Sequence, residues 1–274
     1  MRKNHPVNVE SLLVRPGSKA KLAGRDPSDT LGIEEKKEGQ SLFEKNLSRL
    51  PLLQQRLYAE SRQALLIILQ AMDGGGKDGT IRRVLSILNP QGCHVKSFKS
   101  PSSLELSHDF LWRIHHAVPA AGEIGVFNRS HYEDVLIVRV HEMVPRPVWS
   151  ERYDQINDFE RMLSRNGVRI LKFFLNISKE EQKERLQARL DDPEKHWKAD
   201  PADARERLHW DEYQKAYEAA LTRCSTPWAP WYIIPADRKW FRDLAVSTVL
   251  LQALEQMNPK FPKPPQDLSA IRID

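Results

Sequence analysis

The stretch AMDGGGKDGT, residues 71–80, has the residue types of a phosphate-binding loop but departs from the usual pattern at two positions. That pattern is Gly, four residues, and then Gly-Lys-Ser/Thr. Here Ala71 takes the first position, and Asp78 follows Gly76 and Lys77. Backbone N–H groups of such a loop surround phosphate oxygens, and the dipole of the following helix adds attraction. A tight turn that binds nothing is the alternative interpretation.

The loop residues suit both phosphate and metal binding. Gly74, Gly75 and Gly76 permit a close approach and unusual backbone angles, and Lys77 supplies a point charge. A carboxylate at Asp73 would repel phosphate unless a cation lay between them. We therefore interpret Asp73 as a ligand of Mg²⁺.

Two further polar residues, Asp78 and Thr80, come at the start of the helix predicted after the loop. Thr80 offers a hydroxyl group to phosphate. For Asp78, an ordinary helix cap or first-turn acid is the favoured alternative.

A second stretch, EIGVFNRSHYEDVL at residues 123–136, is an apolar strand that ends in polar groups. Asn128 stands where an acid is usual in such sites, Arg129 follows, and Glu133 comes five residues later. If residues 130–135 begin a helix, Glu133 turns back toward the metal. A solvated helix acid is the alternative for Glu133.

Strands and helices alternate along the chain and must position these residues. The apolar run Ala64–Ala71 predicts a strand buried on both faces, and residues 78–88 predict a helix. Further helices are predicted at 44–61, with a break near Pro51, at 179–190 and at 205–221. Further strands are predicted at His94–Phe98, Ile124–Phe127, Arg169–Ile177 and Trp231–Pro235. This alternation predicts a three-layer α/β/α fold with a mainly parallel five-stranded sheet.

The 274 residues suffice for one large α/β domain with an extension. Residues 1–40 mix Pro, Gly, Ser and charges without a sustained period, which predicts an N-terminal arm on the surface. We assign 41–262 to the main domain, with a helical lid at about 179–221, and 263–274 to a C-terminal tail.

Composition narrows the class of protein. The longest apolar run, Ala64–Leu69, is far shorter than the roughly 20 residues that span a membrane, and no signal peptide is evident. Only Cys93 and Cys224 are present, which indicates reduced thiols. A cytoplasmic protein without a membrane partner is expected. The net charge of +5 suits an anionic partner, which could be nucleic acid, an acidic membrane surface or a phosphate-rich small substrate.

Three ordered motifs in this chain resemble the polyphosphate kinase type 2 family. Its members carry a loop close to GxDxxGKxG, a strand followed by F-(D/N)-R-S-x-Y, and a lid segment like DPxKxWK. The corresponding segments are AMDGGGKDG at 71–79, FNRSHYEDV at 127–135 and DDPEKHWK at 191–198. The similarity extends from about residue 50 to Pro262. Ala71 and Asn128 depart from residues found in many members.

The resemblance implies a P-loop kinase fold similar to thymidylate kinase. It further implies phosphoryl transfer from inorganic polyphosphate to nucleotides with Mg²⁺, for which Mn²⁺ can substitute, by a homo-oligomer such as a dimer or tetramer. Asn128 with Glu133 nearby resembles the subgroup called class III, which phosphorylates both AMP and ADP.

Residue roles follow from the resemblance. The implied metal ligands are Asp73 and Glu133, with Asn128 as a further catalytic residue beside Lys77 and Arg129. The implied phosphate-binding residues are Gly74, Gly75, Gly76, Lys77, Asp78, Gly79, Thr80, Arg82, Arg185 and Arg189.

Other charged residues extend this picture. Arg185 and Arg189 share a helix face that suits a lid over a polyanion, although an exposed helix surface is the alternative. A positive track is predicted along Arg82, Arg83, Lys195 and Lys198. Asp109 and Arg113 are candidates for contact with the acceptor nucleotide, and a structural helix pair is the alternative.

Two other functions stay open. One is a nucleotide kinase of the same fold that uses ATP as donor. The other is a basic nucleic-acid-binding protein, which ranks last because no recognition helix, aromatic RNA-binding motif or zinc module is evident. The favoured interpretation therefore has no nucleic-acid partner.

Overall fold

The computed structural model describes residues 7–264 and 273. At its centre lies a five-stranded sheet in which the strand order is β2-β3-β1-β4-β5 and every pairing is parallel. The strands are β1 (Ala64–Gln70), β2 (Cys93–Ser97), β3 (Ile124–Asn128), β4 (Val168–Asn176) and β5 (Trp231–Pro235). All five predicted strands are confirmed. Because the strands are parallel, their carboxyl ends meet at one edge of the sheet.

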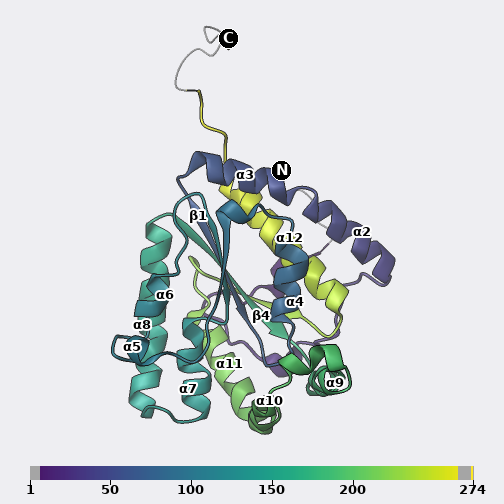
Figure 1. Cartoon of the computed structure of the whole chain (residues 1–274), viewed down its shortest axis with the longest axis vertical. Helices are drawn as coiled ribbons and strands as arrows, with labels where there is room; N and C mark the ends of the chain where they lie inside the picture. The colour runs from purple at the N-terminus through teal and green to yellow at the C-terminus, as the bar shows by residue number, and fades with distance from the viewer. Residues whose placement is uncertain (1–6, 265–272, 274) are drawn as a thin grey trace.

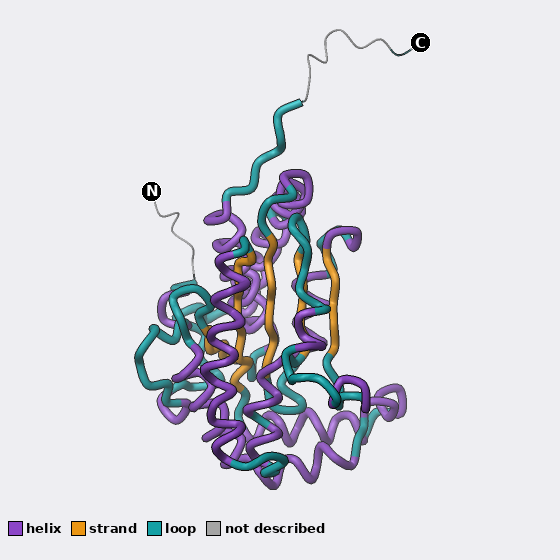
Figure 2. The backbone as a smooth tube through the Cα atoms, turned by 90° about the vertical axis from the view of Figure 1, so that its left-hand side faces the viewer, coloured by secondary structure: helices purple, strands orange, loops and turns teal. Residues whose placement is uncertain are grey.

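Helices cover both faces of the sheet, as predicted for a three-layer α/β/α fold (Figures 1 and 2). One layer contains α2 (Lys36–Leu47), α3 (Leu50–Glu60) and α12 (Lys239–Met257). The other contains α6 (Trp112–His115), α7 (Ile137–Val140), α8 (Arg146–Arg165) and α11 (Trp210–Cys224). All seven residues of β1 are buried, because Leu65 and Ile67 face one layer while Leu66 and Ile68 face the other.

The helix after the glycine loop begins at Lys77 and changes its winding within two turns. Helix α4 (Lys77–Thr80) passes directly into a π-helical turn, Ile81–Leu85. Such turns are rare and occur frequently at functional sites. The break predicted near Pro51 is also present, because α2 ends at Leu47 and Pro51 lies in the first turn of α3.

Several short elements complete the chain. Beyond the carboxyl edge of the sheet lie α9 (Lys179–Leu190) and α10 (Pro201–Glu206), which are joined by the 3₁₀ turn Pro193–Lys198 (Figure 1). The remaining elements are α1 (Val9–Leu12), α5 (Ser103–Leu106) and 3₁₀ turns at Leu22–Gly24, Pro90–Gly92, His131–Val135 and Arg207–His209.

The N-terminal segment packs against the fold, unlike the surface arm that its composition predicted. Leu12 and Val14 are 2% exposed, and Leu13 forms an antiparallel bridge with Tyr232 of β5. The segment therefore covers the outer edge of β5. Its apolar residues form only short, irregularly spaced runs such as Leu12–Val14, so no periodic pattern indicated their burial.

The lid segment is also divided by its packing. Ala216, Ala220 and Leu221 of α11 are buried in the core beside α8, whereas residues 179–209 overhang the carboxyl edge. In the described part of the chain, no helix combines the length and apolar character required to cross a membrane.

Replacing Leu12 with Ala tests whether the N-terminal segment belongs to the core. We expect the free energy of unfolding to fall by about 2 to 5 kcal/mol, because the change leaves a cavity. Leu52→Ala is the matched control, since Leu52 is 47% exposed, and it should change stability by about 0.5 kcal/mol or less. Urea denaturation of both variants gives the comparison. Equal, small losses would mean that the segment contributes nothing to the core.

Candidate functional site

The glycine loop between β1 and α4 is held in an unusual backbone conformation. Gly74 and Gly76 adopt φ angles of 79° and 97°, which side chains with a Cβ rarely adopt. Lys77 Nζ donates a 2.8 Å hydrogen bond to the Ala71 carbonyl oxygen. The Lys77 side chain thus folds back over the glycine loop that precedes it, and its ammonium group lies near the N-terminus of α4.

Close contacts explain why two glycines of the loop cannot carry a side chain. A Cβ on Gly75 would lie 2.5 Å from Ala71 Cβ. A Cβ on Gly76 would lie 2.0 Å from Nη1 of Arg242, a buried residue of α12. Arg242 is fixed in turn by Asp243, whose Oδ1 accepts hydrogen bonds of 2.9 and 2.7 Å from its Nε and Nη2.

The end of β3 brings the second motif against the loop. Leu69 of β1 pairs with Asn128 of β3, so the residues after both strands are neighbours. Asn128 Nδ2 donates to Asp78 Oδ1 at 2.7 Å. Arg129 Nη2 donates to Asp73 Oδ1 at 2.8 Å. The two sequence motifs are therefore joined by a hydrogen bond and an ion pair.

Arg129 adopts a left-handed backbone conformation, with φ at 63°. This conformation is uncommon for a residue other than glycine, and such strain is concentrated at functional sites. Its backbone N–H donates to the Leu69 carbonyl oxygen at 3.1 Å. The strained residue is thus tied to the end of β1 through both its backbone and its side chain.

Four charged groups influence one another at this point. Burial would raise the pKa of Asp73, but Lys77 and Arg129 outweigh it and the pKa is lowered. Burial lowers the pKa of the Lys77 ammonium, and Asp73 partly opposes that shift. Burial raises the pKa of Glu133, against the attraction of Arg129 and Lys77. Asp73 is therefore held as a carboxylate among cations.

A cavity of about 1220 Å³ opens over the loop. Twelve Lys and Arg residues line it against seven Asp and Glu residues, so its walls carry a positive excess. The predicted residues that line it are Asp73, Gly74, Gly75, Gly76, Lys77, Asp78, Gly79, Arg82, Arg83, Asn128, Arg129, Arg185, Arg189, Lys195 and Lys198. An anionic ligand with several charges fits this lining.

Two predicted residues close to the loop do not line the cavity. Thr80 is buried, and its hydroxyl donates to the Gly76 carbonyl oxygen at 3.1 Å. Glu133 lies in the 3₁₀ turn after β3, where the positive charges of Arg129 and Lys77 act to lower the pKa of its carboxyl group. The predicted position of Glu133 beside the metal stays a prediction.

Asp109 and Arg113 do not form the helix pair considered from the sequence. Helix α6 begins at Trp112, and Asp109 precedes it, accepting a 2.9 Å hydrogen bond from the Leu111 N–H. Asp109 lines a separate cavity of about 400 Å³. Arg113 donates to the Lys99 carbonyl oxygen at 2.8 Å.

The arginines of α9 differ in what they contact. Arg185 donates to the carbonyl oxygens of Gly74, Ala236 and Asp237 at 3.1, 2.6 and 3.0 Å. It therefore joins α9 to the loop and to the end of β5. Arg189, one turn later, donates to Asp203 of α10 at 2.8 Å.

Some residues at the site were not identified from the sequence. Gln182 Nε2 donates to the Asp73 carbonyl oxygen at 2.9 Å, and Arg242 packs on Gly76. Lys36, Lys99 and Lys239 also line the cavity. These residues occur in ordinary helical and loop sequence, so only the fold brings them to the site.

Oxygen atoms at the loop suit a hard divalent cation. Asp73 and Asp78 present carboxylates to the cavity, and the Asn128 side chain lies beside them. Among the described residues, no cluster of three or more His, Cys, Asp or Glu forms a ready metal cage. Two carboxylates, completed by water and substrate phosphates, are a usual shell for a hard divalent cation.

Substituting Gly76 with Ala tests the tight contact with Arg242. The positive φ and the displaced guanidinium should lower the free energy of unfolding by about 1 to 3 kcal/mol. Gly24→Ala is the matched control, because nothing lies within 4 Å of its added Cβ, and it should be neutral or stabilise by up to about 1 kcal/mol. Urea denaturation measures both. If Gly76→Ala is as stable as the control, the loop geometry described above is incorrect.

Comparison with known proteins identifies the family of this chain. The family model named polyphosphate kinase 2 matches residues 33–262. The AMP/ADP-polyphosphate phosphotransferase of Meiothermus ruber is 51% identical over 95% of this chain and 98% of that protein, and the ADP-polyphosphate phosphotransferase of Rhodopseudomonas palustris is 47% identical over 94% and 93%. The crystal structure of polyphosphate kinase 2 from Arthrobacter aurescens matches with a TM-score of 0.91 and 48% identity, over 94% of this chain and 93% of that one. The resemblance inferred from the three motifs is thus confirmed, and the chain belongs to the polyphosphate kinase 2 family.

Proposed function

We propose that this chain transfers phosphoryl groups from inorganic polyphosphate to AMP and ADP, giving ADP and ATP. The observation that carries the proposal is the cationic cavity built over a phosphate-type loop. Basic residues line the cavity from the loop to α2 and α9, and a lining of this extent suits a chain of phosphates. The name of the Meiothermus relative supports both AMP and ADP as acceptors, and with them the class III subgroup, whereas the name of the Rhodopseudomonas relative supports ADP.

The protein would act mainly by positioning and charge neutralisation, because phosphoryl transfer demands little covalent chemistry of the enzyme. Lys77, which donates to the Ala71 carbonyl oxygen in this structure, would exchange that bond for phosphate oxygens. Arg129 lies across from it and would neutralise charge on the transferred group. The N–H groups of Gly74 and Gly76 would surround the phosphate next to α4. That of Gly75 would first have to release the Met72 carbonyl oxygen, to which it donates at 2.9 Å.

Mg²⁺ is the cofactor that this site would hold, and Mn²⁺ could replace it. The metal would neutralise phosphate charge when bound. Asp73 would be its main protein ligand, since its carboxylate lines the cavity and its lowered pKa keeps it ionised. Glu133 would act beside it, and Asn128 would hold Asp78 in place.

The overhanging segment 179–209 would close over the phosphate chain. Arg189, Lys195 and Lys198 extend from it into the cavity lining, and a closing lid would exclude water from the transfer. Arg82 and Arg83 would continue the positive track on the opposite side. Asp109 and Arg113 remain candidates for the acceptor side, because Arg113 holds Lys99, which lines the cavity.

The remaining expectations concern the setting of the enzyme. We propose a cytoplasmic homo-oligomer, a dimer or tetramer, with no nucleic-acid or membrane partner. Two unpaired cysteines, Cys93 and Cys224, are compatible with a reducing compartment.

The choice of donor is tested by offering one donor at a time. With long-chain polyphosphate, Mg²⁺ and AMP but no ATP, we expect ADP and then ATP to form; ADP as acceptor should give ATP directly. Chromatography of the nucleotides follows both reactions. Product from ATP alone would favour the ATP-dependent kinase instead. Tight binding to duplex or single-stranded nucleic acid with a steep salt slope would favour the third function.

Asp73→Asn tests the metal site. The amide keeps the size of the side chain but removes its charge, so the Mg²⁺ concentration for half-maximal activity should rise about tenfold or more. Asp158→Asn is the control, because Asp158 is an exposed acid of α8, 69% accessible, and it should leave the requirement unchanged. Titration of activity with Mg²⁺ distinguishes the two. A parental Mg²⁺ requirement in Asp73→Asn would remove this residue from the metal site.

A further inference from the structure

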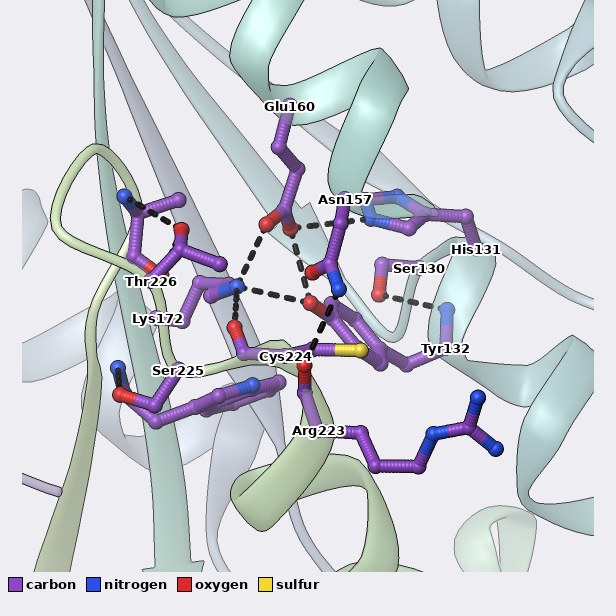
Figure 3. A network of polar contacts seen from close by, with 12 residues as sticks. Ser130, His131, Tyr132, Asn157, Glu160, Lys172, Arg223, Cys224, Ser225 and Thr226 are labelled. Atoms are coloured by element: carbon purple, nitrogen blue, oxygen red, sulfur yellow. Dashed lines mark hydrogen bonds and ion pairs between the residues drawn. The ribbon is translucent and has the colours of Figure 1, made fainter. Parts of the chain in front are cut away.

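A buried ion pair contacts the start of the turn that follows β3, at His131 and Tyr132 (Figure 3). Lys172 is the central residue of β4, and Glu160 lies on α8. Both side chains are 0% exposed, and Lys172 Nζ lies 2.5 Å from Glu160 Oε2. Neither residue lines the cavity described above.

The ammonium group of Lys172 has a partner for each of its three protons. Besides Glu160, it donates to the Tyr132 hydroxyl and to the Cys224 carbonyl oxygen, both at 2.7 Å. Its Nζ also lies 5.2 Å from the ring centroid of Trp231, the residue of β5 that is paired with Lys172 of β4. The lysine is therefore fixed between the sheet, α8 and the end of α11.

Glu160 connects Lys172 to the 3₁₀ turn His131–Val135. Its Oε1 accepts a 2.9 Å hydrogen bond from the Tyr132 hydroxyl and lies 3.3 Å from His131 Nε2. His131 and Tyr132 are the first two residues of the 3₁₀ turn His131–Val135, and Glu133 is the third. The ion pair thus contacts the two residues that directly separate Arg129 and Ser130 from Glu133.

The same turn is held from the other side by β1. Ser130 Oγ accepts hydrogen bonds from Gln70 Nε2 at 3.1 Å and from the Tyr132 N–H at 3.2 Å. Arg129, just before it, has the strained φ of 63°. A strained conformation persists only where its surroundings hold it, and here β1, β4 and α8 converge on the turn.

Stability alone does not explain the pair. Removing two charges from water is expensive, and replacing a buried ion pair with apolar residues of similar size is often neutral or stabilising. The position of Lys172 in the middle of an apolar strand would suit Met or Leu as a packing residue. The pair instead makes directional contacts, and apart from the bond between Lys172 and the Cys224 carbonyl oxygen they lead to His131 and Tyr132 of the turn.

We propose that Lys172 and Glu160 are positioning residues for phosphoryl transfer. They fix His131 and Tyr132, and through them the places of Arg129 and Glu133, without touching substrate. This inference rests on the proposed function of the site. A shift of about 1 Å in a group near the reacting atoms can lower a rate about 100-fold, so a small loss of position is enough to matter.

The test compares the parent with Lys172→Met, Glu160→Leu and the double variant. Each single change leaves the other charge buried and unpaired, so the Tm should fall strongly; the double variant should recover most of that loss. Its kcat with polyphosphate and ADP should nonetheless remain about 10- to 100-fold below the parent. The KM for polyphosphate should stay within about twofold, because the phosphate-binding loop is not altered.

Two further variants keep the result interpretable. Tyr132→Phe retains the ion pair and removes the hydroxyl that contacts both of its members, so kcat should fall about 5- to 10-fold and Tm should fall less than in the two single charge variants. Ile170→Val alters a buried neighbour on the same face of β4 and should lower Tm slightly without changing kcat.

The outcomes separate the two claims. An inactive parent would contradict the proposed function itself. An active parent together with parental kcat in the folded double variant would overturn the positioning role and leave the pair as a structural contact. If the double variant does not fold, Tyr132→Phe decides the question, and a parental kcat in that variant would likewise overturn the proposal.

Discussion

Arg129 and Asp73 form an ion pair across the ends of two adjacent parallel strands, with 2.8 Å between Nη2 and Oδ1. The site depends on this contact, because it joins the glycine loop after β1 to the polar turn after β3. It also balances charge. Arg129 and Lys77 lie close together, and without a carboxylate between them they would repel each other. Asp73 therefore allows cations to collect at one edge of the sheet.

The same principle extends around the cavity. Arg242 is paired with Asp243, Arg189 with Asp203, and Arg185 with Glu181. Each pair fixes a guanidinium group before any ligand arrives, and a fixed polar environment of this kind stabilises charge in a transition state without reorganising. Arg242 and Arg185 contact the loop itself, so the helices α9 and α12 help to shape the phosphate cradle.

The sequence predicted the scaffold well because its signals are local. Apolar runs marked β1, β3, β4 and β5, and the glycine-lysine motif marked the loop, since these patterns depend on residues close in the chain; β2 is polar and mostly exposed. Residues whose partners are distant gave no such signal. Leu12 sits in an aperiodic segment yet is buried, and Arg242 lies in an ordinary helical pattern although it contacts Gly76.

Predictions about individual residues depended on where each side chain points in the fold, which a sequence pattern does not give. Arg185 and Arg189 do lie on one helix, but Arg185 is held by three carbonyl oxygens of the loop and β5. Lys172 occurs within an apolar strand pattern, so its pairing with Glu160 could be recognised only once α8 was placed on β4. Thr80, chosen for its hydroxyl, turns that group toward its own helix.

The most direct test of this account is a crystal structure of the chain with Mg²⁺ and a methylene-bridged, non-transferable polyphosphate analogue. We expect phosphate oxygens to accept hydrogen bonds from Lys77 Nζ and from the N–H groups of the glycine loop, with Asp73 at the metal and Arg129 beside the phosphate chain. An analogue bound only outside this cavity, for example near Asp109 and Trp112, would contradict the central claim that the loop after β1 is where phosphate is transferred.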